Sequence, residues 1–113
     1  ETAIRQESDK TIKANLYFNL GVLYMQLEKF EEAEDNFFSA YDLNPEDIEA
    51  LSGIAQTFEN AEKWRRASKF YRELIELDPE NPDHYKGMSR VLIKQGDMDG
   101  ATRYFEKAKQ LGG

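Results

Sequence analysis

Few side chains in this 113-residue chain have the type and spacing that chemistry requires, and the first of them is the single histidine, His84. A protein zinc ion takes about four Cys, His or carboxylate ligands, and the chain has no cysteine and no second histidine. No serine has a histidine base other than His84, and no glycine-rich phosphate loop occurs. We therefore expect His84 to be a solvent-facing residue at the start of a helix.

A second stretch, from Gln95 to Glu106, has part of the spacing of a calcium-binding loop, with Asp97, Asp99 and Gly100 in ligand or turn positions. The first ligand position holds Gln95, however, where such loops require Asp. Apolar residues also keep helical spacing through this stretch, at Ala101, Tyr104, Phe105 and Ala108. We predict a helix here, and a protein that is not an enzyme and has no catalytic residues, no metal site and no cofactor.

The elements that would position any site follow a repeat of 34 residues. In the first unit, large and small residues occur in this order: Tyr17, Leu20, Gly21, Tyr24, Ala33, Phe37 and Pro45. Similar residues return one period later: Leu51, Ile54, Ala55, Phe58, Ala67, Tyr71 and Pro79. A third set follows: Tyr85, Met88, Ser89, Leu92, Ala101 and Phe105. The sequence therefore predicts three tandem units, at residues 14–47, 48–81 and 82–113.

This order resembles the tetratricopeptide repeat, which has an aromatic residue, Leu-Gly and Tyr on a first helix, and Ala, an aromatic residue and Pro on and after a second. The first unit matches best. The glycine of the first unit, Gly21, is replaced by Ala55 and Ser89 in the later units, and Gly113 stands where the third proline would fall. The resemblance implies an all-α fold, a right-handed superhelix of three antiparallel helix-turn-helix repeats known as an α-solenoid.

Helical periodicity and helix-end signals predict six helices. They are expected at residues 9 or 14 to 27, 30–43, 46–60, 64–77, 83–95 and 97–111. Residues 1–13 form a polar lead segment that can extend the first helix. We expect Asn44 and Asp78 to cap the third and fifth helices, with Pro45 and Pro79 in their first turns. Gly96 is expected to close the fifth helix in a left-handed conformation.

Small residues are expected where the helices of a pair cross, because antiparallel helices approach to about 8 to 10 Å only where side chains are small. These residues are Gly21, Ala33, Ala55, Ala67, Ser89 and Ala101. The first helix, by contrast, is apolar nearly all round, and a helix of this kind is normally covered on every side. We expect the lead segment, a partner or a ligand to cover it.

The composition, 40% hydrophobic and 33% charged, is typical of a soluble globular domain. No apolar run approaches the roughly 18 to 20 residues that span a bilayer, and no signal-peptide pattern is present, so we expect no membrane span and a cytoplasmic protein. The absence of cysteine excludes disulfides. Because the chain begins at Glu1 without a methionine, it can be a trimmed fragment.

The net charge of −7 argues against a nucleic-acid partner, and it is unevenly distributed. The three units carry eight acids and one base, seven acids and five bases, and four acids and six bases in turn. Their net charges are therefore −7, −2 and +2. Two interpretations stay open: ordinary solvated helix faces, or electrostatic steering between modules or toward a partner.

The resemblance to the tetratricopeptide repeat also implies a binding surface. In that family the first helices of successive units line a concave groove that binds peptides or extended segments of partner proteins. Carried over to this sequence, the groove is lined by Asn15, Phe18, Val22, Met25, Gln26, Glu49, Gln56, Glu59, Lys86, Arg90 and Lys94. This surface would be apolar, then acidic, then basic.

We therefore expect a non-catalytic protein–protein interaction module that belongs to a larger protein or assembly. Its ligand would be a peptide or partner segment with an apolar anchor at Phe18 and acidic residues near Arg90. The alternative is a structural module that self-associates or docks end to end, and such a module could form a homo-oligomer.

Overall fold

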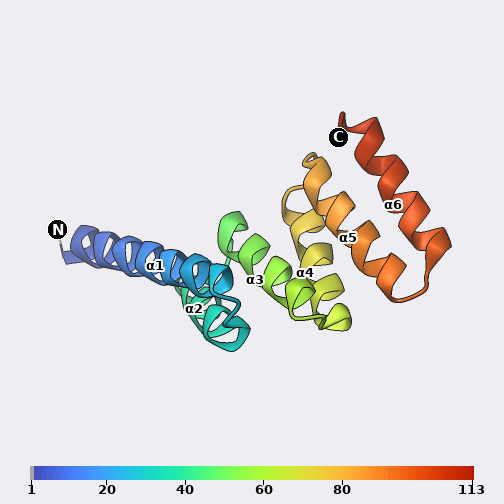
Figure 1. Cartoon of the computed structure of the whole chain (residues 1–113). Helices are drawn as coiled ribbons and strands as arrows, with labels where there is room; N and C mark the ends of the chain where they lie inside the picture. Colours follow the sequence, from blue (N-terminus) through green and yellow to red (C-terminus); the bar gives the residue numbers. More distant parts are fainter. Residues whose placement is uncertain (1) are drawn as a thin grey trace. The chain divides into compact units, whose positions relative to one another are not determined.

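The computed structural model describes the backbone of residues 2–113 and the side chains of residues 9–113, and it contains six helices (Figure 1). They are α1 (Thr2–Gln26), α2 (Phe30–Leu43), α3 (Ile48–Asn60), α4 (Trp64–Leu77), α5 (Pro82–Lys94) and α6 (Met98–Gln110). Residues 2–113 contain no strand, so the predicted all-α class is confirmed. Within the described residues, no helix has the length and apolar character needed to cross a membrane.

The chain folds as two compact units, Glu1–Ile54 and Ala55–Gly113, and the division falls within α3. In the first unit α1 packs against α2, and in the second unit α5 packs against both α4 and α6 (Figure 1). The lead segment does not fold back over the first helix, because residues 2–26 form one continuous helix.

The predicted caps of α3 and α5 are wrong by three residues. Asn44 and Asp78 are instead the C-caps of α2 and α4. The side chain of Asp47 accepts hydrogen bonds from the amides of Glu49 and Ala50, at 3.0 and 3.3 Å. One period later, Asn81 accepts from the Asp83 amide at 3.0 Å, so the short polar side chain nearest the first turn makes the cap.

Three left-handed residues, also one period apart, end the first helix of each hairpin. Gly96 has a φ of +85°, as predicted, and Glu28 and Glu62 have φ values of 58° and 62°. The next amide in each case reaches back five residues, as in the 2.8 Å bond from Lys63 to the Phe58 carbonyl. This is the Schellman arrangement, in which glycine is favoured because a Cβ strains the left-handed backbone.

The core depends on aromatic rings of second helices that lie directly on glycines. Phe37 on α2 is fully buried, and a Cβ added at Gly21 or Gly53 would lie 2.7 or 2.6 Å from its ring. In the second unit, a Cβ added at Gly87 would approach the ring of Tyr71 in the same way. The small residues predicted at the helix crossings are buried: Gly21, Ala33, Ala55, Ala67, Ser89 and Ala101.

Glu62→Gly should stabilise the chain, because it removes the strain of a non-glycine residue at positive φ. We expect a gain of about 0.5 to 1 kcal/mol in the free energy of unfolding, measured by urea denaturation. Glu106→Gly is the matched control, since Glu106 is exposed in the interior of α6 and should lose about 0.5 to 1 kcal/mol. A loss at both positions would contradict the left-handed turn.

Gly53→Ala should destabilise the first unit. In an ordinary helix interior this change stabilises by about 0.5 to 1 kcal/mol, so the sign of the effect reports on the Phe37 contact. We expect a loss of about 1 to 3 kcal/mol in thermal or urea unfolding, which is typical of overpacking. Combining it with Phe37→Leu should show non-additivity, and strictly additive losses would mean that the ring and the glycine do not touch.

Candidate functional site

The predicted groove residues Glu59 and Arg90 meet in the second unit, although they are 31 residues apart in sequence. Arg90 on α5 donates from Nε to Glu59 Oε2 at 2.8 Å and from Nη2 to Glu59 Oε1 at 3.1 Å. The Tyr71 hydroxyl, from α4, donates to the same Oε1 at 2.6 Å. Three helices therefore converge on one carboxylate, and the forked pair fixes the Arg90 guanidinium in place.

Glu59, Tyr71 and Arg90 each shift the pKa of the others. Burial alone would raise the pKa of Glu59, but the hydrogen bonds from Arg90 and Tyr71 outweigh it and hold that pKa below its ordinary value of 4.5. Burial, together with the hydrogen bond to Glu59, raises the pKa of Tyr71 well above its usual range. Glu59 is therefore a carboxylate and Tyr71 a neutral donor at physiological pH.

The two lysines predicted to line the groove, Lys86 and Lys94, lie on α5 near this cluster and form a basic stripe with Arg90. Lys86 is half-buried and Lys94 is exposed on α5, one turn on either side of Arg90. Lys94 Nζ lies 5.9 Å from the centre of the Trp64 ring, within range of a cation–π contact. Gln56, also predicted to line the groove, is exposed on α3. Arg90 is paired with Glu59, and Lys94 lies near the Trp64 ring. Among the three cations, Lys86 is therefore the one with no ion pair or ring contact within the described residues.

In the first unit the apolar residues predicted to line the groove are only partly exposed. Phe18, Val22 and Met25 are all half-buried, and the Phe18 ring packs edge-on against Phe37 with centroids 5.6 Å apart. The predicted polar residues Asn15, Gln26 and Glu49 are exposed. Phe18 is therefore partly a core residue, since its ring covers the buried ring of the neighbouring helix.

The large exposed apolar residues of the first unit were not among the predicted site residues. Ile12, Leu16, Leu23 and Leu27 are 48–64% exposed, and at 3.6 residues per turn they share one face. One and two periods after Leu16 stand Ala50 and His84, both buried. The apolar face of α1 thus corresponds to positions that are covered in later repeats, and the 34-residue period could have revealed it.

The expectation for His84 is wrong, because its side chain is buried at 4% exposure. Its Nε2 lies 3.0 Å from Oδ2 of Asp78, the C-cap of α4, so the pair ties the end of α4 to the start of α5. A buried imidazole needs such a partner. His84 is placed as a structural residue, since one period earlier the same position holds the fully buried Ala50.

The stretch with partial calcium-loop spacing forms the start of α6. Asp97 is the N-cap, and its Oδ1 accepts a hydrogen bond of 2.9 Å from the Gly100 amide. Asp99 and Gly100 lie in the first turn of the helix. The predicted helix is confirmed, and the carboxylate of Asp97 is used for capping.

Replacing Glu59 by Gln should change how stability depends on pH. A depressed carboxyl pKa contributes stability above the unfolded-state value of 4.5, and this contribution disappears as the pH falls through the lower folded-state value. The wild type should therefore be more stable than Glu59→Gln at neutral pH, with the difference shrinking below pH 4.5 in acid–urea titrations. Glu106→Gln changes an exposed carboxylate on α6 and is the control. A pH-independent difference would contradict the ionic role.

Comparison with known proteins places this geometry in context. Matching curated proteins include the human O-mannosyl-transferase TMTC3, at 32% identity over 92% of this chain, and anaphase-promoting complex subunit 3 of Schizosaccharomyces pombe, at 25% identity over 86%. The chain spans only 12% and 15% of their lengths.

Solved structures show the same fold. The crystal structure of MamA matches with a TM-score of 0.85 and 22% identity, covering 88% of this chain and 58% of that one. The type III secretion translocator chaperone SycD of Yersinia enterocolitica matches with a TM-score of 0.84 and 19% identity, covering 88% and 75%. These likenesses confirm the α-solenoid class. Tetratricopeptide repeat families match residues 14–47 and 52–113, and the chain therefore belongs to the tetratricopeptide repeat family.

Proposed function

We propose that this chain is a non-catalytic protein-interaction module that binds an extended or helical segment of a partner protein, with part of the contact made by the faces of α3 and α5 that meet in the second unit. Membership of the tetratricopeptide repeat family supports an interaction role. Its relatives are much longer proteins, so the module would act as one part of a larger protein or assembly.

The observation that carries the proposal is the forked pair between Glu59 and Arg90. It brings a face of α3 and a face of α5 together within the second unit, at residues expected to line the groove. The pair is anchored from below by Tyr71, so the surface is ordered before a ligand arrives. Lys86, Lys94 and the exposed Ile93 flank it. Such a surface suits a ligand with acidic groups.

End-to-end docking or self-association is the second candidate, and the exposed apolar face of α1 favours it. Leu16 and Leu23 correspond by period to Ala50 and Thr57, both fully buried. Exposed patches of this kind usually mark interaction sites. A helix of a preceding repeat, of another domain or of a second copy would bury this apolar face of α1.

Lys86 is the residue best suited to test the groove, because its substitution should change binding without changing stability. Phe18→Ala would leave a cavity beside Phe37, and Arg90→Ala would leave Glu59 unpaired, so both changes would alter stability as well as binding. Peptides selected from a random display library on the wild type should bind Lys86→Glu about three- to tenfold more weakly, because rim charges each contribute up to about 1 kcal/mol. Lys109→Glu on α6 is the charge-matched control.

Two outcomes separate the candidates. If the selected peptides bind Lys86→Glu and the wild type with equal affinity, the groove is not the binding site. A failure to select peptides, combined with a concentration-dependent mass in light scattering that Leu16→Lys abolishes, would favour end docking.

A further inference from the structure

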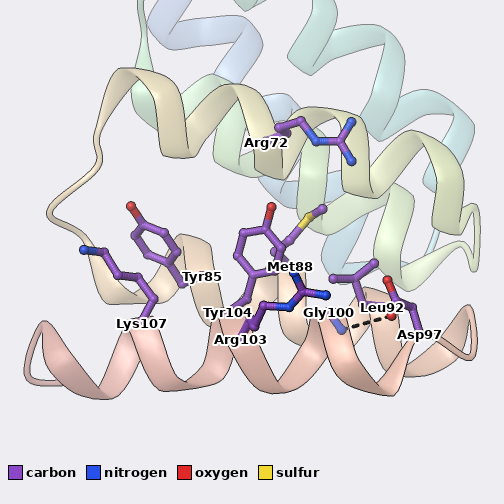
Figure 2. A pocket seen from close by; sticks show the side chains of 9 residues that line it. All are labelled: Arg72, Tyr85, Met88, Leu92, Asp97, Gly100, Arg103, Tyr104 and Lys107. Atoms are coloured by element: carbon purple, nitrogen blue, oxygen red, sulfur yellow. Dashed lines mark hydrogen bonds between the residues drawn. The ribbon is translucent and has the colours of Figure 1, made fainter.

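A pocket of about 520 Å³ lies between α4, α5 and α6 in the second unit (Figure 2). Its lining from α5 is formed by Tyr85, Met88 and Leu92. At 3.6 residues per turn these residues lie on nearly the opposite face of α5 from Lys86, Arg90 and Lys94. The pocket is therefore separate from the proposed groove, and none of the groove residues lines it.

The floor of the pocket is apolar and aromatic, with Met88 and Leu92 buried between the helices. Tyr85 and Tyr104 form an aromatic wall, with ring centroids 6.3 Å apart. The Tyr85 hydroxyl donates to the Pro79 carbonyl at 2.8 Å, which fixes its ring. A volume of this size is typical of ligand pockets and admits one or two large side chains.

The rim of the pocket is basic. Arg72 from α4 and Arg103 and Lys107 from α6 are exposed and line it, and among the side chains described in residues 9–113 no ion pair engages any of the three. The pocket's one acidic residue, Asp97, caps α6 through the Gly100 amide, a bond drawn dashed in Figure 2. Three unpaired cations around an apolar floor stand out in a chain whose net charge is −7.

The Tyr104 side chain adds a polar group to this arrangement. It is half-buried, and its hydroxyl points from α6 toward α4 in Figure 2. No described residue accepts a hydrogen bond from it, so this hydroxyl can donate to a ligand oxygen.

We propose that this pocket is a second binding site, which takes an acidic segment of a partner protein that carries a large apolar side chain. The apolar side chain enters between Met88, Leu92 and Tyr104, and flanking carboxylates face Arg72, Arg103 and Lys107. Apolar burial supplies most of the affinity, and the cations select acidic sequences and speed association. The proposal stands independently of ligand binding in the groove.

The probe is a fluorescein-labelled peptide, Glu-Asp-Glu-Leu-Phe-Glu-Asp-Glu, titrated with the wild-type chain and followed by fluorescence anisotropy. Two comparison peptides carry Lys in place of every acid, or Ala in place of Leu and Phe. We expect both to bind at least about tenfold more weakly than the probe, because each lacks one of the two features that the pocket recognises. Raising the salt from about 50 to about 500 mM should weaken binding of the probe.

Arg103→Glu should weaken binding of the probe about three- to tenfold, since it replaces attraction at the rim by repulsion. Lys109→Glu makes the same charge change on the same helix, outside the pocket, and should change the Kd less than about twofold. Circular dichroism checks that both variants fold. In the wild type, amide NMR shifts induced by the probe should centre on residues 85–92 and 100–107, which tests the site without any substitution.

Several results would overturn the proposal. One is a Kd for the Lys peptide equal to that for the probe. Another is an equal loss of probe affinity in Arg103→Glu and Lys109→Glu. A third is a set of amide shifts confined to the face of Lys86 and Lys94. A concentration-dependent mass that Arg103→Glu abolishes would make a second copy of this chain the occupant, and would equally overturn it.

Discussion

The packing of this chain depends on one recurring contact, an aromatic ring of a second helix seated on the backbone of a glycine. Phe37 fills the space that a side chain at Gly21 or Gly53 would need, and Tyr71 does the same above Gly87. Because protein interiors are close-packed, the ring and the glycine depend on each other: a Cβ displaces the ring, and a smaller ring leaves a void. Repetition of this contact at a spacing of 34 residues lets similar hairpins form along the chain.

The same contact also orders the surface. Tyr71 differs from Phe37 by one hydroxyl, and that hydroxyl extends from the core to the carboxylate of Glu59. Glu59 in turn holds Arg90 with two hydrogen bonds, so a residue packed for stability fixes the position of an exposed cation. Side chains fixed in this way lose less conformational entropy when a ligand binds. In the second unit, core packing and surface geometry are therefore coupled through one residue.

The sequence predicted most of the fold because large and small residues recur with a period of 34 residues. Helix α2 and helix α4 have the predicted ends, since aromatic starts and Asn or Asp stops mark them clearly. The sequence did not predict which of two nearby polar side chains caps a helix. Asp47 rather than Asn44 caps α3. His84 is buried because its position in the repeat faces inward, and the polarity of a lone histidine does not reveal this. For the site, the sequence could name residues on a helix face but not the pairing that commits Arg90 to Glu59, because that pairing depends on residues far apart in the chain.

Cations lie at both faces of α5, on the helix itself at one face and on α4 and α6 at the other, and the two surfaces differ in what lies beneath the charge. On the face of Lys86 and Lys94, the central cation, Arg90, is already neutralised by Glu59, and the surface is mainly polar. On the other face, Met88 and Leu92 lie beneath cations that have no carboxylate partner among the described side chains. Charge alone would attract acidic ligands to either face, whereas burial of an apolar side chain is possible chiefly in the pocket. Because the faces point in nearly opposite directions, ligands on them would not collide, and selectivity between them should follow the apolar content of the ligand rather than its charge.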